Sequence, residues 1–196
     1  MLREKLISLP VLFAKGSSKM SILVAQTRDL LFSGEITLEN YLAYVMRPDS
    51  TRYNLIYGIG VNTHNAFYDM KAVKYLFYNE HRNTLAGKWF HEYILSLDWR
   101  YDSTADEGDF FECCKEVGHT ISTHNGVFQV LFAVHINTGC IHSHFIVNNI
   151  DCHNGRRLRS SYDDLFQLKR KIDQILSRFG YTIIRKDREI KDYREI

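Results

Sequence analysis

Two histidines separated by one residue lie in an extended segment, and this pattern constrains the fold more than any other feature. The segment covers residues 141–148, and because alternate residues of a strand point to the same face, His142 and His144 lie side by side. A second extended run, residues 127–136, contains His135 near its end and is separated from the first by a short connection with a glycine. The sequence therefore predicts an antiparallel hairpin on which the three histidines meet.

Three converging histidines indicate a metal site. Three neutral imidazole nitrogens leave coordination positions open for a substrate oxygen, which is typical of a catalytic rather than a closed structural site. The alternative is that these are ordinary polar residues on an exposed sheet face. A bare pair would leave the two interpretations about equally strong, and His135 at hairpin distance favours the metal site.

Composition indicates one globular domain. The chain has 196 residues, 45% of them hydrophobic, which is enough for a core. The net charge of +2 does not by itself indicate a nucleic-acid partner, so any DNA groove must be local. Four cysteines without paired CxxC spacing favour a reducing cytoplasm over a disulfide framework or a zinc ribbon. The N-terminal apolar stretch matches the pattern of a signal peptide only weakly. No apolar run is long enough to span a bilayer.

Extended and helical patterns alternate along the chain. This predicts an α+β fold: a central, mainly antiparallel sheet with helices packed on one face and the other face free for chemistry. Residues 1–18 are expected to be an N-terminal extension, 19–185 the domain and 186–196 a charged tail or linker. Thr37 is expected to cap the first helix. Strands are expected at 21–25, 53–61, 88–98, 127–136, 141–148 and, at an edge, 181–184, and the other helices at 65–78, around 110–121 and from about 160 to 179.

Tyr44 is the candidate nucleophile. It lies beside the buried stripe of the first predicted helix, shortly before Pro48, so its hydroxyl is expected to clear the core. A tyrosine hydroxyl forms covalent intermediates when a positioned base or a cation-bound electrophile assists it. Most of the 12 tyrosines must be packing residues, and Tyr41 is a second candidate whose position is expected to be buried.

Several stretches, in this order, resemble the motifs of MOB-P-type relaxases, the mobilisation nucleases of plasmids and integrative conjugative elements. Residues 41–51 resemble the first motif, in which a tyrosine shortly precedes an Asn-Pro-Glu-Lys-Thr-like turn, and 55–62 resemble the strand after it. Residues 89–96 resemble the middle motif, and the histidine hairpin with residues 148–151 and 155–160 resembles the third motif and its sequel. The likeness covers roughly residues 21 to 184.

The resemblance implies a HUH endonuclease fold with a five-stranded antiparallel sheet and an activity that nicks one DNA strand at an origin of transfer. Tyr44 would attack the scissile phosphate and remain linked to a DNA 5′ end, and resealing would need no nucleotide cofactor. His135, His142 and His144 would hold a divalent ion, Mg²⁺ or Mn²⁺ in the family, although imidazole ligands also suit Zn²⁺ or Ni²⁺ in a purified sample. The implied partners are single-stranded DNA, origin-of-transfer hairpin DNA, and accessory relaxosome and coupling proteins.

Arginines near both ends of this likeness are expected to contact DNA phosphates. Two flank the tyrosine turn and three follow the histidine strand: Arg47, Arg52, Arg156, Arg157 and Arg159. Arg47 stands where the family usually has asparagine, which places a cation beside the nucleophile. Trp89, Tyr93 and Trp99 share one face of a predicted strand and are either a stacking platform for unpaired bases or part of the core.

Other interpretations stay open at the level of sequence. No general base stands out among His91, Asp49 and Asp98. A HUH replication initiator or transposase usually carries its tyrosine after the histidine motif, where this chain has Tyr162. A nucleic-acid-binding sheet module without catalysis would leave the histidines incidental and would bind no stoichiometric ion.

Overall fold

The computed structural model describes residues 19–26, 34–81, 85–97 and 106–183. The expected extension 1–18 and tail 186–196 lie outside the described residues, as do Asp98 and Trp99. The strands are β1 (Lys19–Gln26), β2 (Ile56–Ile59), β3 (Phe90–Leu97), β4 (Val130–His135), β5 (His142–Asn148) and β6 (Tyr181–Ile183). The helices are α1 (Glu35–Val45), α2 (Ala66–Leu76), α3 (Glu107–Ser122) and α4 (Tyr162–Arg178), with a short 3-10 helix, η2 (Tyr53–Leu55).

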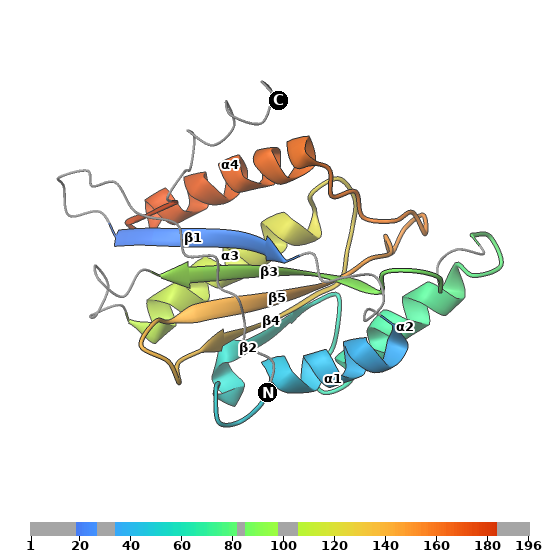
Figure 1. Ribbon diagram of the computed structural model, residues 1–196, viewed down its shortest axis with the longest axis horizontal. Helices are drawn as coiled ribbons and strands as arrows, with labels where there is room; N and C mark the ends of the chain where they lie inside the picture. Colours follow the sequence, from blue (N-terminus) through green and yellow to red (C-terminus); the bar gives the residue numbers. More distant parts are fainter. Residues whose placement is uncertain (1–18, 27–33, 82–84, 98–105, 184–196) are drawn as a thin grey trace, which may run out of the picture.

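The strands form one sheet in the order β2-β4-β5-β3-β1-β6 (Figure 1). The first five strands in this order are antiparallel to their neighbours, and β6 pairs in parallel with β1 at the edge. The α+β class and the mainly antiparallel sheet are confirmed. The sheet has six strands rather than five, because the chain that leaves α4 pairs beside β1.

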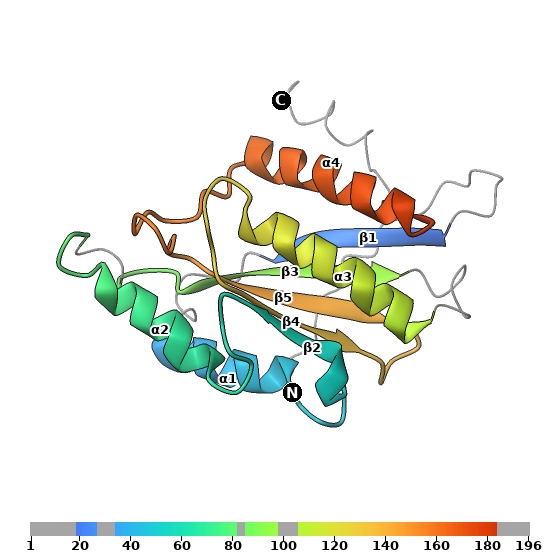
Figure 2. The same ribbon diagram turned by 180° about the vertical axis from the view of Figure 1, so that it is seen from behind.

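Helices cover both faces of the sheet (Figure 2). Because side chains alternate along a strand, Val130, Phe132 and Val134 of β4 face the core beneath α3 and α4, whereas Leu131 and Ala133 face a second core beneath α1 and α2. The expectation of one helix-covered face and one free face is therefore wrong. On this second face, the end of α1 meets His135 at the end of β4.

The helix boundaries follow local capping chemistry. Ser161 and Asp164 form a capping box at the start of α4, and Asp106 accepts hydrogen bonds from two backbone N–H groups at the start of α3. Gly180, with φ of 77°, ends α4 in the left-handed conformation that glycine favours. Thr37 is not a cap, because α1 begins earlier, after Gly34, and has Glu35 rather than a cap side chain in its first turn.

The expected strand 53–61 is shorter in the structure. Its first residues form η2, and the chain turns away from the sheet after Ile59. Gly58 is required there, because a Cβ at this position would lie 2.3 Å from the carbonyl oxygen of Val61. Among the described helices, none is both long and apolar enough to cross a membrane.

Candidate active site

The hairpin of β4 and β5 brings the three predicted histidines together. His135 lies directly opposite His142 in the strand register, and His144 lies two residues further along β5 on the same face. One ligand atom from each imidazole lies within 4.8 Å of the other two. Since zinc–nitrogen bonds are about 2.0–2.1 Å long, this spacing is close to what one ion requires.

Each of these imidazoles has one nitrogen engaged by an oxygen acceptor, which leaves the other nitrogen for an ion. His135 donates from Nε2 to the Val45 carbonyl oxygen at 2.7 Å, and His142 donates from Nδ1 to the Cys140 carbonyl oxygen at 3.0 Å. His144 donates from Nδ1 to Oε1 of Glu92 at 2.7 Å. A carbonyl oxygen only accepts, so these contacts fix which nitrogen carries the proton. The three free nitrogens therefore fit a divalent metal ion.

Burial keeps two imidazoles of this cluster, those of His135 and His142, in the form that binds metal. It lowers the pKa of His135 to about 4 and also lowers the pKa of His142. At neutral pH both rings are therefore uncharged, and an uncharged imidazole has the lone pair that a ligand needs.

Glu92 completes the cluster and was missed in the sequence. It lies on β3, next to β5, and only 2% of its surface is exposed. Its Oε1 accepts the hydrogen bond from His144 and a second one, at 2.6 Å, from the Tyr41 hydroxyl. An acidic residue inside a strand that is otherwise largely buried was the available signal, since such a carboxylate requires partners. Tyr41, buried as expected, thus holds Glu92 rather than facing solvent.

Tyr44 lies beside the histidines at the last turn of α1. Its ring centroid is 6.3 Å from that of His135 and 6.2 Å from that of His144, and the residue is 37% exposed. Two features place it there: the buried stripe of α1 packs on the sheet, and His135 bonds the carbonyl of Val45 at the helix end. The phenol and the imidazoles therefore share one solvent-accessible site.

Arg47 and its turn pack against this site. The guanidinium carbon lies 4.3 Å from the Tyr44 ring centroid, and Nε is 3.1 Å from Oδ1 of Asp49. Ser50 ties the turn to the hairpin, since its carbonyl accepts from the backbone N–H of Ile136 at 2.9 Å. Arg52 lies further along, in an ion pair with Glu107 of α3. Asp49 is therefore paired with Arg47.

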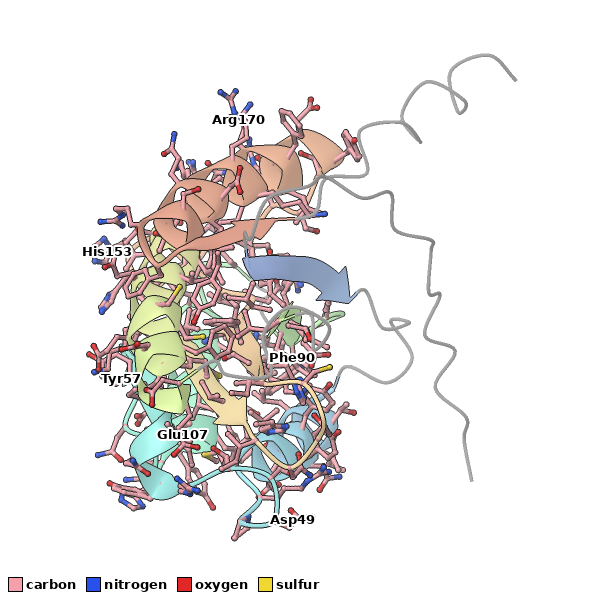
Figure 3. The ribbon with its side chains drawn as sticks, turned by 90° about the vertical axis from the view of Figure 1, so that its left-hand side faces the viewer. Asp49, Tyr57, Phe90, Glu107, His153 and Arg170 are labelled. Atoms are coloured by element: carbon pink, nitrogen blue, oxygen red, sulfur yellow. The ribbon has the colours of Figure 1, made fainter. Side chains whose placement is uncertain are left out.

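The arginines after β5 lie at the other end of the sheet. Arg157 contacts the carbonyl oxygens of Ala86 and Lys88, just before β3. β5 runs seven residues from His142 to Asn148, so these arginines are about 20 Å along the strand from the histidines. In Figure 3, which looks along the strands, the labelled Asp49 lies below the sheet, whereas His153 of this loop lies at the level of α3 and α4. The structure does not bring Arg156, Arg157 and Arg159 to the histidine cluster.

The remaining candidates also lie away from it. Trp89 and Tyr93 are buried in different cores, so for these two residues the core interpretation is right and the stacking-platform interpretation is wrong. His91 is buried opposite Val147, bonded to Asn149 and Lys88, with its pKa lowered by burial to about 4. Tyr162 opens α4 and is exposed.

A phenol beside three imidazoles places a candidate nucleophile next to a candidate metal site, which is suited to phosphoryl transfer. Comparison with known families agrees: the family model "Relaxase: MobA/VirD2-like, nuclease domain" matches residues 44–181, which is more than half of the chain. The chain therefore belongs to the family of MobA/VirD2-like relaxase nuclease domains and is a DNA endonuclease by that membership.

Other comparisons add little. Among curated proteins, no relative of similar sequence matches. A solved structure described as "Molecular Basis of Vancomycin Resistance Transfer in Staphylococcus aureus" is similar with a TM-score of 0.45 and 13% identity, over 68% of this chain and 75% of that chain. So weak a likeness carries no weight beside the family match.

Proposed function

We propose that this domain is a strand-specific DNA relaxase that nicks single-stranded origin-of-transfer DNA and later reseals it during conjugative transfer or mobilisation. The observation that carries the proposal is the Tyr44 ring beside the imidazoles of His135 and His144. The fold does not require a phenol next to a candidate metal centre. Such a phenol is, however, suited to covalent phosphoryl transfer.

In the proposed reaction, the Tyr44 oxygen attacks the scissile phosphorus. A bond forms between that oxygen and phosphorus, and the bond from phosphorus to the 3′ oxygen of the preceding nucleotide breaks. The tyrosine loses its proton to solvent, and the leaving 3′ oxygen gains one. The products are a 5′-phosphotyrosine and a free 3′ hydroxyl, so the reverse reaction reseals the strand without a nucleotide cofactor.

His135, His142 and His144 would hold the divalent ion, Mg²⁺ or Mn²⁺ by family resemblance and Zn²⁺ or Ni²⁺ by ligand chemistry. When bound, such an ion supplies positive charge to the phosphate oxygens. Glu92 orients His144 through the Nδ1–H bond and is held in turn by the Tyr41 hydroxyl. Arg47, beside the Tyr44 ring, is placed to bind a phosphate oxygen of the strand.

The proposed partners are single-stranded DNA, origin hairpin DNA, and accessory relaxosome and coupling proteins, in the bacterial cytoplasm. All four cysteines are free thiols, which supports a reducing compartment. Arg52 and the three arginines after β5 are proposed to contact the DNA backbone. An initiator or transposase that used Tyr162 is less favoured, because that residue begins α4 whereas Tyr44 lies beside the histidines.

The test is covalent capture. The domain is incubated with Mn²⁺ and single-stranded DNA that contains the origin of transfer of its own element, and a protein–DNA adduct is sought on a denaturing gel. We expect the adduct with the wild type and with Tyr162→Phe, and none with Tyr44→Phe. An adduct in Tyr44→Phe would assign the nucleophile elsewhere. No adduct and no stoichiometric metal in the wild type would favour a non-catalytic sheet module.

A further inference from the structure

Two exposed tyrosines lie at the C-terminal end of α2. Tyr75, in the last turn of α2, is 48% exposed and Tyr78, just after the helix, is 42% exposed, with Leu76 between them at 69%. Exposed aromatic rings cost solvation free energy, and tyrosines of this kind commonly serve as contact residues. Single-stranded nucleic acids use such rings to stack unpaired bases.

The loop after β5 contacts Phe77 and His81, which are close in sequence to these tyrosines. His81 Nε2 lies 3.0 Å from the carbonyl oxygen of Asn154, and Gly155 lies so close to Phe77 that a Cβ there would be 2.6 Å from the ring. This loop carries Arg156, Arg157 and Arg159. Arg156 and Arg159 are exposed, and among the described residues no carboxylate forms an ion pair with Arg156.

Positive charge is concentrated on this part of the surface. Residues 75–81, 85–91 and 152–160 contain four Lys and Arg side chains and one acidic residue, Glu80. Their excess of three positive charges is larger than the net charge of +2 of the whole chain. The remainder of the chain is therefore net negative, and a polyanion is attracted to this end.

The two arginines near the nicking site differ in their ion pairing from the arginines of the loop after β5. Arg47 pairs with Asp49, and Arg52 pairs with Glu107. Much of their charge is compensated within the chain, so the histidine end offers less attraction to phosphates than the residue types alone suggest. When no metal ion is bound, a strand at the histidines would therefore gain less electrostatic binding free energy from Arg47 and Arg52 than from unpaired arginines.

We infer that the C-terminal end of α2 and the loop after β5 form a second binding surface for single-stranded DNA, separate from the nicking site. This distal surface consists of Tyr75, Tyr78, Lys88, Arg156, Arg157 and Arg159. Bases stack on the two tyrosines while the arginines bind the backbone. The inference rests on the proposed nicking function. The DNA would then contact the protein at two places, the nicking site and the distal surface, which are about 20 Å apart along β5.

The test is binding of fluorescent oligothymidine in EDTA, so that no nicking occurs. For a strand long enough to span both ends, the Tyr75→Ala/Tyr78→Ala variant is expected to bind about fivefold more weakly or worse for each tyrosine removed. The Phe substitutions at the same positions are expected to retain affinity, because a phenyl ring still stacks. Tyr68→Ala, on the same helix and 65% exposed but remote from the loop, is the matched control and is expected to bind normally.

The arginines are tested through salt. In Arg156→Ala/Arg159→Ala, the slope of log Kd against log salt concentration is expected to fall by about 0.7 for each phosphate that the protein no longer neutralises. Arg170→Ala, on the exposed face of α4, is expected to keep the wild-type slope. Melting temperatures of all variants establish that each is folded.

The outcomes separate this inference from the nicking function. Unchanged affinity and slope in the distal variants overturn the second surface and assign its aromatics to another partner, such as a protein. Equal losses in Tyr68→Ala also overturn it, since the effect would then not be local. Adduct formation on a short origin oligonucleotide is expected to be unchanged in Tyr75→Ala/Tyr78→Ala, because these two side chains have no part in the proposed nicking reaction. Failure of that adduct in the wild type overturns nicking alone.

Discussion

Glu92 shows how one buried side chain organises the site. Its Oε1 accepts from both His144 and Tyr41, so it links a metal-binding imidazole to the helix that carries Tyr44. Glu92→Gln replaces the carboxylate that accepts from His144 by an uncharged amide. The amide cannot raise the basicity of the His144 imidazole as the carboxylate does. We expect metal affinity to fall about 10–100-fold, measured by Mn²⁺ titration.

Glu39→Gln is the matched control, because Glu39 lies on α1 but is exposed. It is expected to bind Mn²⁺ like the wild type. Wild-type affinity in Glu92→Gln would remove Glu92 from the metal site, and a lower melting temperature in the metal-free variant would assign it to folding instead.

At the residue scale, the sequence predicted what local spacing can predict. The alternation around His142 and His144 and the position of Tyr44 before Pro48 are both local patterns, and the structure places all three side chains together. Glu92 is different, because its partners come from β5 and α1 and depend on strand order. The position of Arg157 likewise depends on the direction of β5. This strand begins at the histidines, so the residues after it lie at the opposite end of the sheet.

At the element scale, the loop after β5 depends on one glycine. Gly155 has φ of 67°, and a Cβ at this position would lie 2.6 Å from Phe77 and 2.7 Å from His81. Gly155→Ala therefore combines a left-handed backbone with a clash against a buried ring. We expect a loss of about 1–3 kcal/mol in the free energy of unfolding, measured in urea.

Gly139→Ala is its control, since Gly139 lies in the β4–β5 connection with nothing within 4 Å of the added Cβ. That change is expected to alter the free energy of unfolding by less than about 0.5 kcal/mol. Equal stability of the two variants would mean that the loop moves away from Phe77 without cost.

The elements themselves were largely predictable, with errors where tertiary packing decides. The histidine hairpin, α4 and the strand after Gly180 have strong local signals of periodicity and capping, and all three were confirmed. The second helix layer was missed because the stripes of α1 and α2 do not reveal which sheet face they cover. The β2 region was overextended because the turn after Ile59 depends on glycine geometry rather than on hydrophobic pattern.

At the scale of the whole molecule, one buried cation couples stability to pH. Lys74 of α2 has no exposed surface, and its Nζ lies 5.1 Å from the Trp89 ring centroid. Burial, together with the positive charge of Arg157, lowers the pKa of Lys74 from 10.5 to about 7. Between these two values the unfolded chain binds a proton at this residue that the folded chain has released.

The free energy of unfolding therefore contains a contribution from Lys74 that rises with pH from about 7 to about 10.5 and is lost as the pH falls through that window. Relative to Lys74→Met, wild-type stability in urea is expected to increase by up to about 1.4 kcal/mol per pH unit there. Lys71→Met serves as the control, because the hydrogen bond to Glu35 raises the pKa of Lys71, and its offset from wild type should stay constant over this window. Parallel curves for wild type and Lys74→Met would mean that the Lys74 ammonium stays charged in the folded protein, and that the core beneath α2 accommodates a buried charge.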